Sequence, residues 1–198
     1  MAQRGLLTED ERQPVFGVPR QEHQIIKHYT LSQDDLDLVL RKRGTRNQLG
    51  FAVQLCLLRY PGFGLRLNEA PPREMLAFLA GQLQVSPHVF EDYSRRPQTR
   101  LDHAAELMAR LTLRPAMQED WPLMLGVAAE AAWVTDSGVE IVQAVLDWLC
   151  TQRIILPAPN RLERLARAGR ALARRRAAEA LLAPLTEEQL KAIDALLL

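Results

Sequence analysis

The chain contains few cysteines and no long apolar run. Only two cysteines, Cys56 and Cys150, occur among its 198 residues, so a framework of disulfide bonds is not expected. Both fall within apolar helical patterns, which predicts buried thiols in a reducing compartment. The first nine residues lack the apolar core of a signal peptide, and no later run is long enough to span a bilayer. These absences predict a cytoplasmic protein with no membrane partner.

Motifs of enzyme active sites are also missing. The sequence contains no glycine-rich phosphate loop, no Gly-x-Ser-x-Gly elbow and no recognisable Cys/His pair. The four histidines share no ligand-like spacing with each other or with the cysteines, which argues against a zinc site. Asp34 and Asp37 would share a helix face, but acidic residues are commonplace in a first helical turn. We therefore expect no catalytic residue, no metal, no cofactor and no small-molecule substrate.

A surplus of positive charge is absent as well. The formal net charge is +1, whereas a nucleic-acid-binding domain is usually basic as a whole. Positive charge is nevertheless concentrated in three clusters, residues 41–46, 95–100 and 161–176. The cations are 22 Arg and only 3 Lys. Arg presents a planar fork that matches phosphate oxygens and guanine edges, although a coding bias would explain the same ratio. The placement of charge therefore leaves nucleic acid open as a partner.

From about residue 31 onward the sequence has helical patterns. Ser32 and the carboxylates that follow it predict a capped helix start, and Gly44 is a natural helix stop. Thr45 is the expected cap of the next helix, whose apolar residues follow the i, i+3, i+4, i+7 spacing from Leu49 onward. That helix is apolar nearly all round, so we expect it to be central.

A helix-turn-helix pattern follows. One helix is expected to begin after Pro72 and run through Leu83, and Ser86 with Pro87 predicts the cap and first residue of a second, short helix. Such a unit can place its second helix in a major groove. Most short patterns of this kind in helical proteins are only packing corners, so both interpretations stay open. A longer helix is expected from Thr99 onward.

The second half of the chain predicts further buried helices. An apolar pattern over residues 121–131, which includes Leu123, indicates one of them. A capping box at Ser137 opens another, and a capping box at Asn160 opens a long helix with an apolar stripe. Between residues 161 and 176 this helix carries seven Arg and one carboxylate, a composition that calls for a negatively charged partner. DNA phosphate and an acidic protein surface are both candidates.

These patterns predict an all-α fold of two helical domains with helix-turn-helix-like units and about eight to ten helices. The expected divisions are an N-terminal arm, partly irregular, over residues 1–30, a first helical domain with a candidate DNA-binding surface over 31–112, and a second helical domain with the Arg-rich helix over 113–198. The boundary is placed near residues 113–120 because Pro115 ends the preceding helix.

The most informative stretch is residues 41–48, RKRGTRNQ, which leads directly into the central apolar helix. Four positive charges within six residues, interleaved with Thr and Asn, suit a surface for phosphate oxygens. A simpler interpretation also fits, because cations favour the C-terminus of a preceding helix and Gly44 can end that helix. Residues 93–100, YSRRPQTR, add three Arg with Gln, Thr, Ser and Tyr as further partners for phosphates or bases.

Several of these segments resemble one known family. The similarity is carried by residues 31–46, by NQLGFAVQLCLLRYPG at 47–62, by FEDY at 90–93 and by RRPQTRLDH at 95–103. In wording, order and spacing these closely resemble the N-terminal region of transposases from the Tn-three family of bacterial replicative transposons. The likeness extends more loosely through residues 154–157 and the Arg-rich helix, so it covers nearly the whole chain.

The resemblance implies a function that composition does not reveal. In that family, helical domains near the N-terminus recognise the terminal inverted repeats, and a distant C-terminal domain with a ribonuclease-H-like fold supplies three metal-binding carboxylates. The chain is thus expected to bind double-stranded DNA at a terminal inverted repeat, in transposition and DNA recombination in the bacterial cytoplasm. It is not expected to be an enzyme by itself. Its other partner would be the remainder of the transposase, a homodimer when full length.

Candidate DNA contacts lie in the three basic clusters. Asn47, Gln98 and Arg100 are expected to read base edges, because their side chains can make bidentate contacts with adenine or guanine. The other candidates are expected mainly at phosphates and comprise Arg41, Lys42, Arg43, Thr45, Arg46, Arg95, Arg96, Thr99, Arg161, Arg164, Arg174 and Arg175. The alternative function is a non-catalytic helical interaction or regulatory module that binds an acidic partner and shows no preference among DNA sequences.

Overall fold

The computed structural model describes residues 6–65 and 70–189, and this part of the chain is helical with no β-strand. An isolated parallel bridge joins Arg114 to Ile154, and a helical turn begins at residues 187–189. The predicted all-α class is confirmed. The helices, in chain order, are α1 (Glu9–Phe16), α2 (Glu22–Tyr29), α3 (Gln33–Leu40), α4 (Thr45–Arg59), α5 (Arg73–Gln82), α6 (Val89–Ser94), α7 (Pro97–Arg110), α8 (Asp120–Val134), α9 (Gly138–Thr151) and α10 (Pro159–Leu182).

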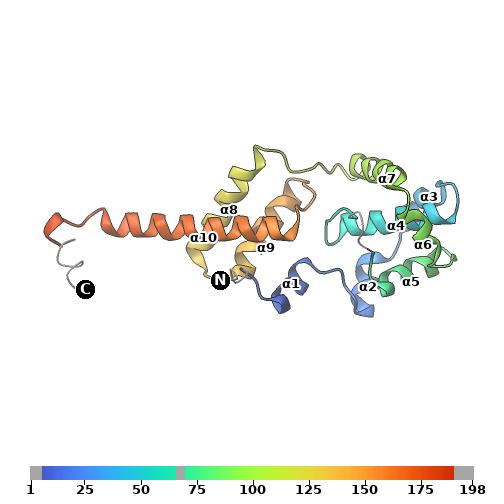
Figure 1. The fold of residues 1–198 in the computed structure, drawn as a ribbon, viewed down its shortest axis with the longest axis horizontal. Helices are drawn as coiled ribbons and strands as arrows, with labels where there is room; N and C mark the ends of the chain where they lie inside the picture. Colours follow the sequence, from blue (N-terminus) through green and yellow to red (C-terminus); the bar gives the residue numbers. More distant parts are fainter. Residues whose placement is uncertain (1–5, 66–69, 190–198) are drawn as a thin grey trace. The chain divides into compact units, whose positions relative to one another are not determined.

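Two compact units make up the chain, and each is described by itself. The α1–α7 unit holds the described residues of 9–116 together with 149–158. The α8–α10 unit holds those of 6–8, 117–148 and 159–189. The sequence did not predict α1 and α2, which precede residue 31 (Figure 1). The three divisions proposed at residues 1–30, 31–112 and 113–198 stay a prediction. Within the described residues no helix is long and apolar enough to span a membrane.

Helix α4 forms the centre of the α1–α7 unit, as its all-round apolar pattern predicted. Every residue from Leu49 to Leu58 is buried, and α3, α5, α6 and α7 pack around it. Gly50 permits one of these contacts, because a Cβ at this position would run into the ring of Tyr93 on α6. A helix interior normally disfavours glycine by about 1 kcal/mol relative to alanine. Close approach of α6 to α4 therefore explains why glycine stands here.

An ion pair ties the start of α3 to the end of α4. The predicted cap at Ser32 is present and forms a capping box, with its side chain accepting from the Asp35 amide and Asp35 accepting from the Ser32 amide. The two oxygens of the Asp35 carboxylate also accept hydrogen bonds from the two terminal guanidinium nitrogens of Arg59, at 2.7 and 2.5 Å. Burial would raise the pKa of Asp35, but the hydrogen bonds from Arg59 and Ser32 outweigh it and lower the pKa below its ordinary value. The pair fixes α3, and with it the segment that follows.

Three predicted caps are wrong. Gly44, not Thr45, is the N-cap of α4; its φ of +86° suits glycine and lets the chain turn one residue earlier, so Thr45 is already helical. Ser86 does not cap α6, because α6 begins only after His88. Over residues 86–91, the backbone amides of 89–91 each bond to the carbonyl three residues before, which is the pattern of a 3₁₀ turn. Asn160 lies inside the first turn of α10, since Pro159 occupies the first helical position.

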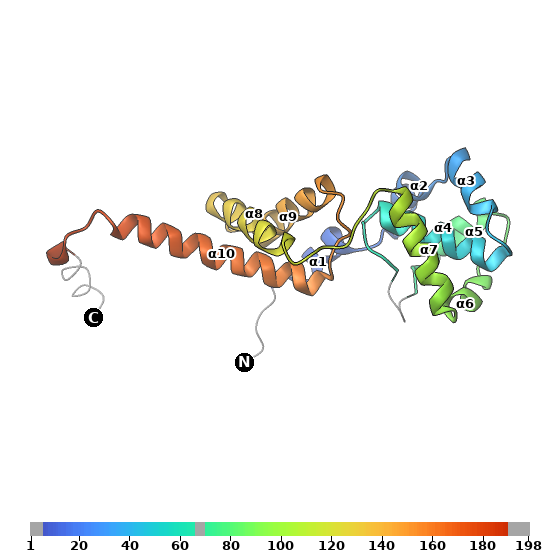
Figure 2. The same cartoon turned by 90° about the horizontal axis from the view of Figure 1, so that it is seen from above.

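The α8–α10 unit is built on the pairing of α8 with α10. A Cβ at Gly169 of α10 would lie 2.5 Å from the Cβ of Ala128, so the small residues let the two helices approach closely. The predicted apolar stripe of α10 is confirmed, with Leu162, Leu165 and Ala173 buried. Past Ala173 the helix continues to Leu182 with mostly exposed side chains, and Figures 1 and 2 both show it running beyond α8 and α9.

Burial corrects two expectations, one in each unit. Leu123 was expected in the buried face of α8 but is 57% exposed, because α8 buries Asp120, Met124 and Ala128 instead. Cys150 was expected to be a buried thiol but is exposed, one position past the buried Leu149 of α9. Ser137 does cap α9, with the Glu140 amide 3.4 Å from its Oγ. A helix that is apolar nearly all round does not reveal in its sequence which side faces the core.

Candidate nucleic-acid interface

Residues 41–48, which we call the elbow, link α3 to α4 as a closed turn. The Nε2 of Gln48 donates to the carbonyl of Lys42 at 3.1 Å and, more weakly, to that of Leu40 at 3.4 Å. The Nδ2 of Asn47 donates to the carbonyl of Arg43 at 2.8 Å. These amides satisfy carbonyls at the end of α3 and in the turn after it. A bidentate contact of Asn47 with adenine would have to break its bond to Arg43, so the structure favours a capping role for this residue.

The elbow cations differ in their surroundings. Lys42 points back onto the unit: its Nζ lies 2.5 Å from each carboxylate oxygen of Glu106 on α7 and 4.3 Å from the centre of the Phe51 ring. Arg41 and Arg43 are exposed and Arg46 is half-buried. Among the described residues, no ion pair joins any of these three arginines to a carboxylate. The elbow thus presents three guanidinium groups, with Thr45 exposed beside them.

Arg110 shares a shallow depression with Arg41, although no sequence pattern marked it as a candidate. Asp34, Asp37 and Leu38 line the rest of this depression. Arg110 is the last residue of α7, where a cation is ordinary because it complements the helix dipole, so its sequence position gave no functional signal. Only the packing of α7 beside α3 brings the two arginines to one depression.

The second cluster lies where α6 meets α7, at residues 95–99, which we call the corner. Arg95, Arg96 and Gln98 are exposed, and Thr99 is half-buried. Gln98 donates to Asp102 one turn later at 2.8 Å. Arg95 lies 4.0 Å from Asp92, but both side chains are more than 60% exposed, and such surface pairs contribute little and yield readily to a phosphate.

Arg100 does not belong to the exposed cluster. It is only 7% exposed, and its Nη2 donates to the Leu65 carbonyl at 3.3 Å. Tyr93, the aromatic partner expected beside the corner, is fully buried against α4. The sequence therefore marked a basic segment but did not show which of its side chains face inward. The period of α7 contained the signal: Arg100, His103 and Leu107 form its buried face at i, i+3 and i+7.

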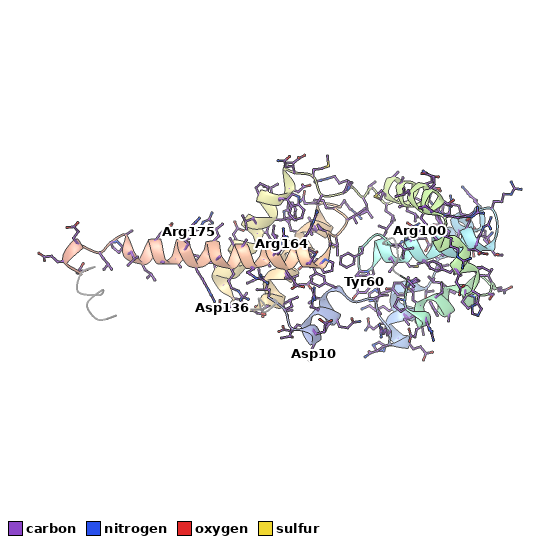
Figure 3. All side chains as sticks on the ribbon, viewed as in Figure 1. Asp10, Tyr60, Arg100, Asp136, Arg164 and Arg175 are labelled. Carbon is purple, nitrogen blue, oxygen red and sulfur yellow. The ribbon has the colours of Figure 1, made fainter. Side chains whose placement is uncertain are left out.

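The arginines of α10 are arranged along one helix of the α8–α10 unit. Arg174 pairs with Asp136 at 3.0 Å, and Arg175 lies 3.7 Å from Glu179. Arg161 sits 6.0 Å from the ring of Trp121. All three remain exposed, as does Arg164. Figure 3 shows Arg164 and Arg175 on the same helix, α10. Straight geometry and a rise of about 1.5 Å per residue suit a helix that follows a line of phosphates.

The sequence of residues 6–169 matches the family described as a domain of unknown function, DUF4158. The chain belongs to this family. It is also similar over its whole length to curated transposases, with 36% identity over 197 residues to the transposase for transposon Tn501 of Pseudomonas aeruginosa and 35% to that for transposon Tn21 of Escherichia coli. Identity to the transposase for transposon gamma-delta of Escherichia coli (strain K12) is 26% over 165 residues, 80% of the chain. The resemblance to the Tn-three family is thus confirmed.

Members of this group are much longer than the region that matches. The chain spans about 20% of the length of the Tn501 and Tn21 transposases and 16% of the gamma-delta transposase. The DUF4158 match contains the elbow, the corner and the first part of α10. In the described residues, no three His, Cys, Asp or Glu side chains come together as metal ligands.

Proposed function

We propose that this chain is the region of a Tn-three family transposase that binds the terminal inverted repeats of its transposon. The observation that carries the proposal is the match of the whole chain to transposases, combined with exposed arginines at the elbow, at the corner and along α10. The relatives are named for transposition, which requires the protein to find the ends of its element. Guanidinium groups on a helical scaffold are the usual means of binding DNA phosphates.

In this proposal the α1–α7 unit reads sequence and contacts phosphates. Arg43 and Arg46 of the elbow, with Arg95 of the corner, bind phosphate oxygens and set the register of the unit on the duplex. Gln98 reads a base edge, since its carboxamide can replace the exposed bond to Asp102 with a bidentate contact to adenine. Arg41, Thr45, Arg96 and Thr99 supply further donors beside them. Arg100 is assigned to the scaffold because it is buried.

The α8–α10 unit adds a contact that does not depend on sequence. Arg161 and Arg164 begin the exposed row on α10, and Arg175 lies in the part of the helix that extends past α8 (Figure 3). Each phosphate that such a row neutralises releases counterions, which makes the slope of log K against log salt steeper by about 0.9. The row therefore increases affinity for any duplex without selecting one.

Strand cleavage and transfer are assigned to parts of the transposase outside these 198 residues. The chain matches only about a fifth of the length of its relatives, and the proposal therefore makes it a non-catalytic region that works with the remainder of the protein as a homodimer. Catalytic metal ions would be held by that remainder.

A titration with two duplexes tests the proposal. Fluorescence anisotropy would be measured with a labelled duplex from the terminal inverted repeat of the element that encodes the chain, and with a scrambled duplex of equal length and composition, at about 50 and 200 mM salt. The proposal expects tighter binding to the repeat at both concentrations and weaker binding to both duplexes at the higher one. Equal affinity for the two duplexes would overturn specific recognition.

One observation favours a second function. The end of α10 exposes apolar residues, with Leu181 73% and Leu182 47% exposed. A helical interaction module that binds an acidic and partly apolar protein surface would use this end together with the Arg row. Such a module predicts no difference between the repeat and the scrambled duplex, so the same titration separates the two functions.

A further inference from the structure

Lys42 differs from every other cation of the elbow in where its charge is placed. Its side chain is only 16% exposed, and its Nζ is enclosed by both Glu106 oxygens and by the face of the Phe51 ring. A phosphate that approached this amine would have to displace a carboxylate and would meet its negative charge. The position of Lys42 is therefore poor for a DNA contact but good for holding the elbow against α7.

The contacts of Lys42 continue through the interior to the corner. Phe51 of α4 meets the His103 ring of α7 edge-on, with centroids 5.1 Å apart. His103 Nδ1 lies 3.0 Å from the Tyr93 hydroxyl of α6. Gln54 of α4 donates to that hydroxyl and, at 3.0 Å, to the backbone carbonyl of Arg100. An unbroken series of side chains thus leads from the elbow to both helices that border the corner.

These polar groups are expensive to bury unless each finds a partner, and here they do. Gln54, near the middle of the buried helix α4, is 2% exposed, yet it bonds to one residue of α6 and to one of α7. Apolar packing alone would permit α6 and α7 to shift on α4, whereas directed hydrogen bonds fix their position. The ion pair of Lys42 with Glu106 places the elbow on the same helix α7.

We propose that Lys42 is a positioning residue, which acts through Glu106 and the buried Gln54–Tyr93–His103 hydrogen bonds to hold the elbow and the corner as one DNA-reading surface. This inference rests on the proposed function and departs from the sequence expectation that Lys42 binds a phosphate. A fixed spacing between two contact segments is what sequence recognition requires, because bases are read only when both segments are in register with the duplex.

Substitutions on the two sides of the ion pair separate positioning from phosphate contact. Removing the carboxylate in Glu106→Ala frees the Lys42 amine and deletes a negative charge near the DNA. If Lys42 bound phosphate, this variant would bind every duplex more tightly. A positioning role predicts the opposite: about tenfold weaker binding to the repeat, with little change for the scrambled duplex.

Salt dependence gives a second readout. Lys42→Met is expected to weaken binding to the repeat but to leave the slope of log K against log salt unchanged, since no phosphate contact is lost. The matched control is Arg43→Met, one residue away and exposed, which is expected to weaken binding to both duplexes and to reduce the slope by about 0.9. If the salt slope of Lys42→Met is also reduced by about 0.9, Lys42 binds a phosphate and the inference is overturned.

A charge exchange completes the experiment. Lys42→Glu alone is expected to lose discrimination between the duplexes, and the double variant Lys42→Glu with Glu106→Lys is expected to recover it to within about threefold of the wild type, because the pair re-forms in reverse. Failure of the exchange to recover discrimination, with helical content and melting temperature restored, contradicts the positioning role. Equal binding of the wild type to both duplexes would reject the proposed function. Even then, the salt slope of Lys42→Met would decide whether this residue contacts a phosphate.

Discussion

The protein has two basic surfaces and holds them in different ways. The first surface is the elbow together with the corner, and the second is the Arg row of α10. The first surface has four exposed arginines, and buried hydrogen bonds and an ion pair beneath it fix their spacing. The second has five exposed arginines on one straight helix, whose outer half carries mostly exposed side chains. Fixed spacing suits the reading of bases, whereas a row of flexible guanidinium groups suits the phosphate backbone. We therefore expect two surfaces of similar composition to serve different tasks.

The largest expected effect comes from breaking the packing beneath the first surface. In Gly50→Ala the added methyl group collides with the ring of Tyr93, and overpacking of this kind costs about 1–3 kcal/mol. We expect a lower melting temperature by circular dichroism and loss of preference for the repeat. Gly81→Ala on α5 is the matched control, because its Cβ would meet nothing within 4 Å. Similar melting curves for the two variants would show that Gly50 is not required for packing.

Removing the hydrogen bonds while keeping the volume is expected to have the next largest effect. Gln54→Leu leaves the Tyr93 hydroxyl and the Arg100 carbonyl without their donor, at a cost of about 1–3 kcal/mol in the free energy of unfolding. Chemical denaturation measures this cost. Below the melting temperature the variant should bind the scrambled duplex normally and the repeat more weakly. A variant that keeps full discrimination would mean that apolar packing alone positions the corner.

Removing arginines from α10 tests the second basic surface. Arg164→Ala combined with Arg175→Ala removes two exposed cations of α10 and leaves the first surface intact. We expect weaker binding to both duplexes by the same factor and a salt slope smaller by about 1.8, which is twice the contribution of one phosphate contact. A selective loss for the repeat would show that α10 reads sequence as well.

The smallest expected effect is a dependence of stability on pH through His103. Burial lowers the pKa of this ring below its ordinary value of 6.5, and the charge of Lys42 lowers it further, against the opposing effect of Glu106. As pH falls, His103 takes up a proton in the unfolded chain before it does so in the folded protein. The contribution of neutral His103 to the free energy of unfolding is therefore complete above about pH 6.5 and is lost below it. His103→Gln should make the free energy of unfolding decline less between pH 7 and 5, as measured by chemical denaturation. If the decline is unchanged in this variant, other titratable groups cause it.

The sequence predicted those parts of the fold that follow from local patterns. Period and capping were sufficient for α3, for the central α4 and for the apolar stripe of α10, because each depends on residues close together in the chain. Helices α1 and α2 were missed; α1 is short and has Pro14 within it. The cap at Thr45 was wrong by one residue and the cap at Asn160 by two, since glycine and proline before them allowed an earlier helix start.

The candidate site was predicted as segments but not as individual contacts. Charge clusters identified the elbow and the corner, yet the direction of each side chain depends on partners far away in the chain. Lys42 turns inward because Glu106 lies beside it, and Arg100 because the Leu65 carbonyl accepts from it. Neither partner is marked in the sequence by spacing. Arg110 was overlooked for the same reason, as only tertiary packing brings it to the depression lined by Arg41.

We propose that these 198 residues read a DNA sequence and that the first surface performs the reading. Competition binding measures this most directly: the dissociation constants of the wild type and of Glu106→Ala are compared for the repeat and for the scrambled duplex at one salt concentration. We expect a preference of at least about a thousandfold for the repeat in the wild type, at the low end of specific DNA binding, and a preference reduced about tenfold in the variant. Equal affinity of the wild type for both duplexes, or tighter binding to both by the variant, would contradict it.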